Sequence, residues 1–255
     1  MRLLFLYGAR DSDKNTDPAF FEGLNNTLRQ VSRSDTEIEV WGLTDNVFDV
    51  SESVYWYAHS KAVTDMIYKA KKAEKEGFDG VIIGCVGAVD AEYALKEILS
   101  IPVVGVGEAS FLLALALGAN FSVLTYSDKA YAWLYKTVRD YGLEDRCVSI
   151  RQAGRSWDEL MQSSSKEDAY QKMLEQANLA IKEDHADVIV LCSIGITELA
   201  DYLRKRVAAA VVDPTEAGVK FAEMLIDLHK TKGLLHSKAL TYKPSPNTDK
   251  TLNVV

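Results

Sequence analysis

The chain has 255 residues, of which 47% are hydrophobic and 26% charged, so it can bury a large core as one domain or as two smaller ones. Its formal net charge of -8 and its isoelectric point near 5.1 argue against nucleic acid or an anionic membrane as a partner, because both would repel it. The N-terminal apolar run is too short for a signal sequence or a membrane span, and the three cysteines lack metal-ligand spacing. These features predict a cytoplasmic protein with free thiols and no metal site.

Short apolar runs alternate with helical patterns along the chain. In chain order, the expected strands are 2–7, 37–41, 80–84, 103–106, 121–125, 188–192 and 210–212. The expected helices between and after them are 19–32, 60–76, 91–99, 110–117, 128–141, 166–184, 197–206 and 215–232. Such strongly apolar strands are typical of parallel sheets that are covered on both faces. Their alternation with helices predicts an α/β fold with right-handed crossovers.

An internal repeat is the most informative feature. The segments "GFDGVIIGCVGAVDAEYAL", starting at residue 77, and "HADVIVLCSIGITELADYL", starting at residue 185, match at a constant offset of 108 residues. The repeat predicts two pseudo-symmetric, flavodoxin-like parallel-sheet domains with the active site at their interface, the first formed by 1–106 plus 213–255 and the second by 107–212. The alternative is that any two strand-helix units look alike at this level of identity.

The repeat places Cys85 and Ser193 at equivalent positions, each at the end of an expected strand. Gly87 and Gly195 follow two residues later, ahead of a helix. Backbone amides at such a helix start favour an anion, and they should lower the pKa of a thiol placed there. We therefore expect Cys85 to alternate between thiolate base and thiol acid near neutral pH. The alternative is that Cys85 is a small buried core residue.

Several motifs resemble a known family. "GFDGVIIGCVG", "IPVVGVGEAS", "FSVLTY", "YGLEDR", "ADVIVLCSIG" and "AAAVVDPTEAGVKFAEMLIDL" are together similar to the Asp/Glu/hydantoin racemase superfamily, most of all its hydantoin and allantoin racemase branch. The resemblance covers roughly residues 1–230. It implies an enzyme without cofactor in which two cysteines flank an acidic carbon, one removing a proton and the other returning it from the opposite face. Cys85 matches the first cysteine.

The chain departs from this branch at two points. Within "CSIG", Ser193 stands at the position of the second cysteine and Cys192 at that of a glycine, and an unassisted serine is a poor base. A one-residue slip would aim Cys192 into the site, but the two-residue period of a strand argues against it, and Cys192, like Cys147, fits a core position better than Cys85 does. At the end of the first strand, "YGAR" replaces an Asn-Pro-Asn-Thr segment, so Arg10 would bring a cation near the pocket and favour a carboxylate substrate over a neutral ring.

The candidate site also includes residues after the strand 121–125, which match family positions that hydrogen-bond the substrate. For Ser127 a helix N-cap is the alternative. The four histidines have no catalytic spacing and are expected at the surface. The predicted catalytic residues are Cys85 and Ser193, and the predicted substrate-binding residues are Tyr7, Arg10, Val86, Gly87, Thr125, Tyr126, Ser127, Ile194 and Gly195.

Three functions remain open at this stage. The first is a cofactor-independent racemase or isomerase that acts on a carbon next to a carboxylate or carbonyl, with Cys85 as acid and base. The second is a decarboxylase or lyase of the arylmalonate type, which needs only one thiol. The third is a non-catalytic binding protein on the same fold. In each case we expect a small carboxylate-, amide- or hydantoin-like ligand and a homo-oligomer.

Overall fold

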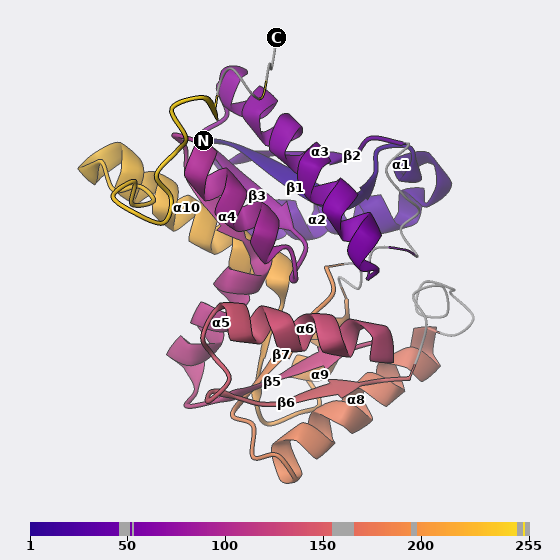
Figure 1. The fold of residues 1–255 in the computed structure, drawn as a ribbon. Coiled ribbons are helices and arrows are strands. Elements are labelled where there is room, and N and C mark those ends of the chain that lie inside the picture. The colour runs from indigo at the N-terminus through magenta and orange to yellow at the C-terminus, as the bar shows by residue number, and fades with distance from the viewer. Residues whose placement is uncertain (46–51, 53, 155–165, 195–197, 249–251, 253–255) are drawn as a thin grey trace.

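The computed structural model describes residues 1–45, 52, 54–154, 166–194, 198–248 and 252, which form two parallel four-stranded sheets (Figure 1). Across the first sheet the strands are β2 (Glu37–Leu43), β1 (Arg2–Arg10), β3 (Gly80–Gly84) and β4 (Val103–Gly105). Across the second they are β6 (Cys147–Gln152), β5 (Phe121–Thr125), β7 (Val188–Leu191) and β8 (Ala210–Val212). The two sheets have the same strand order, so the predicted α/β fold with two similar halves is confirmed.

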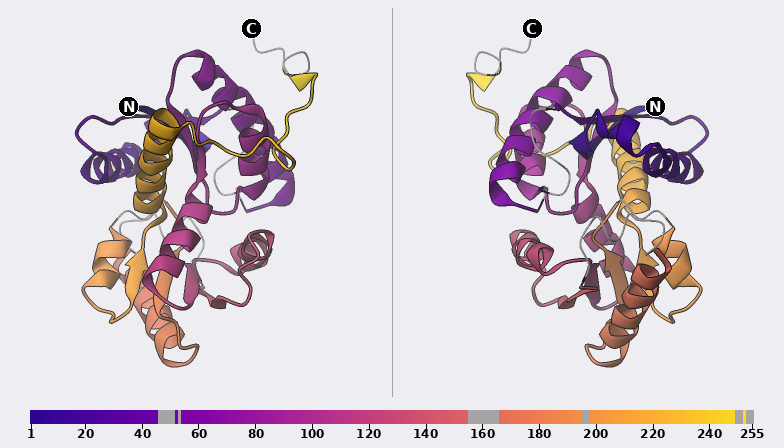
Figure 2. Two further views of the ribbon diagram at one scale, coloured as in Figure 1. Left: turned by 90° about the vertical axis from the view of Figure 1, so that its left-hand side faces the viewer. Right: turned by 90° about the vertical axis from the view of Figure 1, so that its right-hand side faces the viewer.

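Helices cover both faces of each sheet. On the first sheet, α3 (Trp56–Lys75) and α4 (Val89–Ile98) pack on one face, and α2 (Pro18–Val31) and α10 (Pro214–Lys232) on the other. On the second sheet, α8 (Lys166–Lys182) and α9 (Leu199–Arg204) oppose α5 (Val106–Leu117) and α6 (Asp128–Asp140). Figure 2 shows α10 lying against the first half of the chain. None of the helices in the described ranges is long and apolar enough to cross a membrane.

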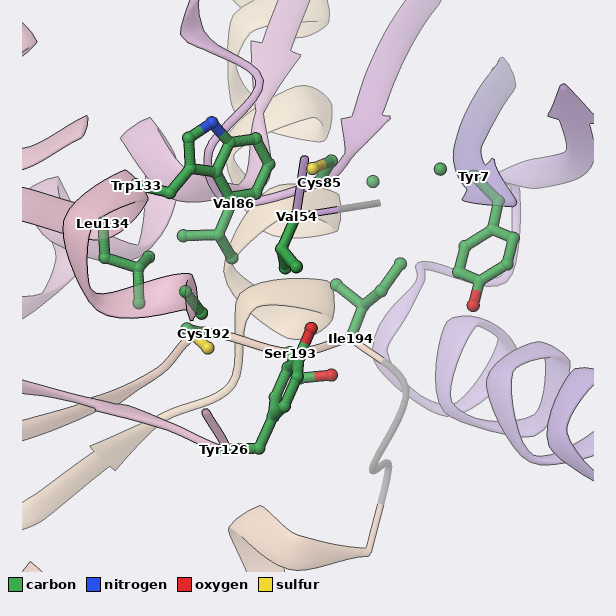
Figure 3. A pocket seen from close by; sticks show the side chains of 13 residues that line it. Tyr7, Val54, Cys85, Val86, Tyr126, Trp133, Leu134, Cys192, Ser193 and Ile194 are labelled. Atoms are coloured by element: carbon green, nitrogen blue, oxygen red, sulfur yellow. The ribbon is translucent and has the colours of Figure 1, made fainter. Parts of the chain in front are cut away.

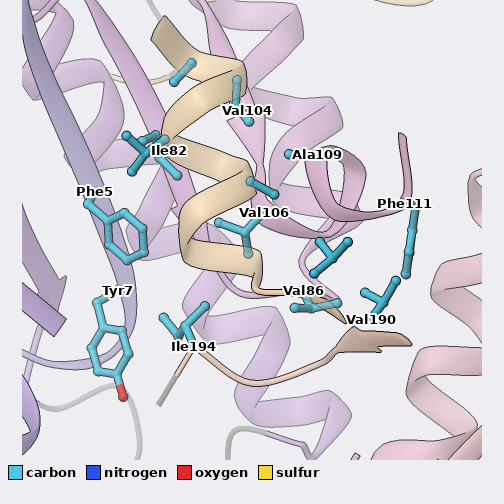
Figure 4. Close-up of a cluster of buried hydrophobic side chains, with 14 of the residues drawn as sticks. Phe5, Tyr7, Ile82, Val86, Val104, Val106, Ala109, Phe111, Val190 and Ile194 are labelled. Atoms are coloured by element: carbon cyan, nitrogen blue, oxygen red, sulfur yellow. The ribbon is translucent and has the colours of Figure 1, made fainter. Parts of the chain in front are cut away.

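One cluster of buried apolar side chains includes residues of both sheets. Phe5 and Ile82 of the first sheet and Val190 of the second belong to the same buried cluster, which α5 and α10 connect (Figure 4). The outer faces have their own clusters, under α3 and α4 and under α8 and α9. The shared core fixes the two sheets relative to each other, and with them the loops at their strand ends.

The strand register brings the carboxyl ends of the central strands together. Tyr7 of β1 pairs with Gly84 of β3, and Leu124 of β5 pairs with Leu191 of β7. The loop that begins with Cys85 after β3 therefore lies beside the carboxyl-terminal part of β1. In the second sheet, the loop after Leu191 lies beside the end of β5 in the same way. Ligands of parallel α/β sheets bind at such strand ends.

The repeat extends to ion pairs on the helices. Lys96 Nζ lies 2.7 Å from Glu108 Oε2, and Arg204 Nη2 lies 2.6 Å from Glu216 Oε2, at positions related by the same 108-residue offset. In the first half a further carboxylate joins the pair, because Glu92 Oε1 lies 2.6 Å from Lys96 Nζ. Glu92 and Lys96 are buried, whereas the Arg204 pair is partly exposed. In the second half Asp201 Oδ1 lies 3.1 Å from Arg204 Nη1, so each half carries one cation between two carboxylates, buried in the first half and partly exposed in the second.

Two elements were not expected from the sequence. Strand β6 lies at a sheet edge, where only one strand neighbours it and most of its residues are half-buried, so its apolar pattern is weak. The short helix α1 (Asp13–Thr16) follows β1 directly. The expected strands 103–106 and 188–192 each end one residue earlier, at Gly105 and Leu191.

Candidate active site

The loops after β3 and β7 face each other across one cavity of about 90 Å³. Figure 3 shows Cys85 on one side of this cavity and Ser193 with Cys192 on the other. A water molecule occupies about 30 Å³ of liquid, so the cavity has room for several waters or a small organic molecule. The described lining residues are Tyr7, Gly8, Val54, Gly84, Cys85, Val86, Tyr126, Ala130, Trp133, Leu134, Cys192, Ser193 and Ile194.

Cys85 sits directly after β3, where the chain turns into α4. The backbone N–H groups of Gly87 and Ala88 donate toward its sulfur and lower its pKa. Burial acts more strongly in the opposite direction and raises the pKa of Cys85 to about 11. The expectation of a thiol with a lowered pKa is therefore wrong. Loss of hydration destabilises the thiolate more than the two amide hydrogen bonds stabilise it.

Cys192 and Ser193 both line the opposite wall. The backbone N–H of Cys192 donates to the carbonyl oxygen of Leu124 at 3.0 Å, so Cys192 still pairs with β5 directly after β7. Cys192 packs against the core that both sheets share, as the sequence predicted, and its side chain also lines the cavity. Burial raises its pKa to about 12, and the negative charge of a Cys85 thiolate raises it as well, whereas the Thr125 hydroxyl and the Tyr126 N–H lower it.

Trp133 of α6 is a major wall of the cavity that the sequence did not reveal. Its indole ring packs on Gly87, where a Cβ atom would lie 2.8 Å from two ring carbons. The ring centroids of His59 and Trp56 lie 5.0 and 6.4 Å from that of Trp133. His59 has an exposed fraction of only 6%, so the expectation that all four histidines lie at the surface is wrong. Its burial lowers its pKa and favours the neutral imidazole.

Two tyrosines bring phenol groups to the cavity. Tyr7 extends from β1 and packs on a tilted Phe20 ring and on Phe21 in an edge contact, with ring centroids 5.4 Å away in both cases. Burial raises the pKa of Tyr7 far above its ordinary value, so its phenol stays protonated. Tyr126 follows β5 on the second wall. A protonated phenol in this position can donate a hydrogen bond to a substrate oxygen.

Some predicted residues stand apart from the cavity lining. Arg10 Nη2 lies 2.9 Å from Asp13 Oδ1 of helix α1, and the guanidinium does not line the cavity. Thr125 is fully buried beside Cys192, and Ser127 occupies the N-cap of α6 without a capping side-chain bond. Gly195 lies outside the described residues. Val86 and Ile194 line the cavity as predicted neighbours of the two loops.

The described part of the lining carries no formal charge. Its only polar side chains are the two thiols, the two phenols and the Ser193 hydroxyl, together with the indole N–H of Trp133. Nor do three His, Cys, Asp or Glu side chains gather in the manner of a metal site within the described ranges. The described geometry is that of a small neutral cavity with thiol and hydroxyl groups on opposing walls.

Comparison with known proteins agrees with this geometry. The family model described as Asp/Glu/Hydantoin racemase matches residues 14–222. A hydantoin racemase from a Pseudomonas species is 34% identical over 230 residues, covering 90% of this chain and 88% of that protein. The crystal structure of allantoin racemase from Pseudomonas fluorescens superposes with a TM-score of 0.79 at 30% identity, covering 96% of this chain and 97% of that one. Arylmalonate decarboxylase shares the fold, with a TM-score of 0.56 at 17% identity over 95% of this chain and 97% of that one.

Proposed function

The chain belongs to the Asp/Glu/hydantoin racemase family, and on that premise we propose that it racemises a hydantoin-like ring at the carbon next to a carbonyl group. Its homology to hydantoin and allantoin racemases makes it an isomerase of the racemase type. The observation that carries the choice of substrate is the uncharged lining of the described cavity. A free carboxylate would lose its hydration there without gaining a cation as a partner. An uncharged ring has no ionic hydration to lose, so its transfer into the cavity costs less free energy.

The position of Arg10 supports the same choice. The expectation of a carboxylate substrate rested on this guanidinium, which is bound to Asp13 instead. The arylmalonate-type decarboxylase alternative requires a carboxylate substrate, so the same neutral lining argues against it. A hydantoin ring is compatible with the cavity because its carbonyl and N–H groups need hydrogen-bond partners, not counter-ions.

In the proposed reaction the Cys85 thiolate removes the proton from the ring carbon. The electron pair of the broken C–H bond moves to the adjacent carbonyl, whose oxygen becomes an enolate oxygen. The neutral phenol of Tyr7 and the hydroxyl of Ser193 line the cavity and can donate hydrogen bonds to the ring oxygens. A proton delivered from the opposite wall then gives the other enantiomer. Because the ring carbonyl accepts the electrons, this scheme uses no cofactor.

Solvent isotope exchange tests the proposal. Each enantiomer of a 5-substituted hydantoin and of allantoin is incubated with the protein in D₂O, and both optical rotation and deuterium at the ring carbon are followed. We expect loss of rotation accompanied by deuterium uptake. Cys85→Ala should lower both rates by about 100-fold or more, the usual contribution of a positioned acid-base group.

Cys147→Ala is the matched control, because Cys147 is also a buried thiol but lies at the start of β6 and does not line the cavity. It should keep the wild-type rates. Absence of deuterium uptake by the wild-type protein with every probe would refute the proposed function. An equal loss in both cysteine variants would mean that the effect of Cys85 is structural.

A further inference from the structure

Trp133 belongs to the second half of the chain but packs on residues of the first half. It extends from α6, and its indole covers Gly87, two residues after Cys85, where a Cβ atom would lie 2.8 Å from two ring carbons. Its ring also packs against those of Trp56 and His59, which lie three residues apart on one face of α3. The wall of the cavity beside Cys85 therefore depends on a contact between the two halves.

His59 is the buried one of these two neighbours. Its exposed fraction is 6%, whereas that of Trp56 is 45%. The ring centroids of His59 and Trp133 lie 5.0 Å apart with an interplanar angle of 78°, which is the edge-to-face arrangement that aromatic rings favour. Trp56 can move into solvent, but His59 lies in a buried stretch of α3 together with Ala58 and Ala62 and has no such freedom. His59 therefore fixes the position of the indole more firmly than Trp56 does.

The Nε2 atom of His59 is buried and makes no hydrogen bond within the described ranges. Asp90 Oδ2 lies 3.9 Å away, which is too far for one. Burial lowers the pKa of His59, and the opposing charge of Asp90 on α4 does not outweigh it, while Lys136 on α6 lowers the pKa further. The neutral imidazole is therefore favoured. His59 thus acts on Trp133 as a flat neutral ring, not through a hydrogen bond or a charge.

We propose that His59 is a positioning residue: its ring holds Trp133 against the loop that follows Cys85, and so keeps that wall of the cavity in place. This inference rests on the proposed function, in which Cys85 removes the substrate proton. Burial raises the pKa of Cys85 from 9.0 to about 11, and Trp133 lines the same cavity. If the indole were released, water would reach the thiol and the substrate would lose a wall. Loss of His59 should thus produce more thiolate and yet slower racemisation.

The experiment compares His59→Ala, which removes the ring, with His59→Phe, which keeps one. The rate at which iodoacetamide alkylates each cysteine is measured by mass spectrometry at pH 8, together with kcat/KM for the probe that the wild-type protein racemises fastest. In His59→Ala, alkylation of Cys85 should rise by about tenfold, as for a thiol whose pKa falls by about one unit, while that of Cys147 stays the same. The value of kcat/KM should fall by about tenfold, because a misplaced wall costs about 100-fold and the additional thiolate returns part of that loss.

In His59→Phe, both quantities should stay within about threefold of the wild-type values, because an aromatic ring again faces the indole. The melting temperature should be unchanged or higher, since the substitution removes a buried nitrogen without a partner in the described ranges. His236→Ala is the matched control. His236 is a half-buried histidine that accepts a hydrogen bond from the Val103 N–H at the start of β4, at the opposite ends of the strands from the cavity. Its loss should lower the melting temperature and leave Cys85 alkylation and kcat/KM unchanged.

A double-mutant cycle shows whether His59 acts through Trp133. In a Trp133→Leu background, His59→Ala should change neither Cys85 alkylation nor kcat/KM by more than about twofold. His59→Leu takes the place of His59→Ala in both backgrounds if the alanine variant does not fold. The inference is overturned if the variant without the ring behaves as the wild type, if the effects in the cycle add, or if His59→Phe is impaired as much as His59→Ala. It is overturned as well if Cys147 alkylation rises as much as that of Cys85. A wild-type protein that exchanges no probe refutes the proposed function instead, and the alkylation rates then still test the role of His59.

Discussion

Gly87→Ala tests the contact that closes the cavity over Cys85. The added methyl carbon would lie 2.8 Å from Cε3 and Cζ3 of Trp133 and 2.9 Å from Cδ2, closer than carbon atoms pack in proteins. The indole cannot simply swing away, because His59 and Trp56 lie 5.0 and 6.4 Å from its ring. Overpacking of this kind costs about 1–3 kcal/mol of unfolding free energy.

Urea unfolding measures that cost, and the racemisation assay measures its effect on the site. Since Trp133 lines the cavity, its displacement should also lower kcat/KM by about tenfold or more, as small misplacements in active sites do. Gly8→Ala is the matched control on the same cavity. Its methyl would lie 3.7 Å from Cys85 Cβ, an ordinary contact, so unfolding free energy should stay level or rise by up to about 1 kcal/mol.

A double-mutant cycle identifies the cause. In a Trp133→Leu background the indole carbons are absent, and Gly87→Ala should then cost less than about 0.5 kcal/mol. If the cost is the same in both backgrounds, the clash with Trp133 is not its source and the reasoning fails. In that case the loss would have to come from the backbone of the loop after Cys85.

The other predictions concern charge. Lys96→Met would leave Glu92 and Glu108 without the cation that lies 2.6–2.8 Å from their oxygens. It should lower the free energy of unfolding in urea by about 3–5 kcal/mol, and a loss below about 1 kcal/mol would show that the carboxylates find other partners. In the proposed reaction the Cys85 thiolate is the base. Because burial raises the pKa of this thiol to about 11, log kcat/KM should rise by about one unit per pH unit from pH 7 to 9, and a flat profile would contradict the raised pKa. Lys238 Nζ lies 3.0 Å from the carbonyl oxygens at positions 97 and 99, at the end of α4. Lys238→Met should therefore lower the free energy of unfolding by about 1 kcal/mol and leave kcat/KM unchanged. Thermal unfolding and the racemisation assay measure these two quantities.

The sequence predicted most of the fold because its central strands are buried on both faces. Such strands read as continuous apolar runs, and the 108-residue repeat located their carboxyl ends, where Cys85 and Ser193 lie. Strand β6 was missed because an edge strand is only half-covered. The role of Arg10 was misjudged for a related reason, since its partner Asp13 belongs to a short helix that the sequence pattern did not indicate.

Other features of the site depend on tertiary packing. No sequence pattern within α6 indicates that Trp133 lines the cavity, because its contact with Gly87 depends on the position of the two sheets relative to each other. Cys192 shows the same dependence. The strand pattern places it against the core, but only the packing of the two halves makes its side chain line the cavity as well.

The sign of the Cys85 pKa shift shows how burial and local hydrogen bonds compete. The helix start is visible in the sequence and predicts a lower pKa for Cys85. The burial of the thiol cannot be read from the sequence, and its effect on the pKa is the larger of the two. A pKa raised from 9.0 to about 11 makes the thiolate about 100-fold rarer at neutral pH. It also makes that thiolate a stronger base, but thiolate reactivity rises with a coefficient of only about 0.4–0.5 per pKa unit, so about tenfold is recovered.

Burial must therefore contribute to the proposed reaction in another way. In a cavity shielded by Trp133, hydrogen bonds from Tyr7 and Ser193 to an enolate oxygen are stronger than in water. The burial that makes the Cys85 thiolate rarer thus also strengthens the hydrogen bonds that stabilise the enolate, and in the proposed reaction the second effect offsets part of the first.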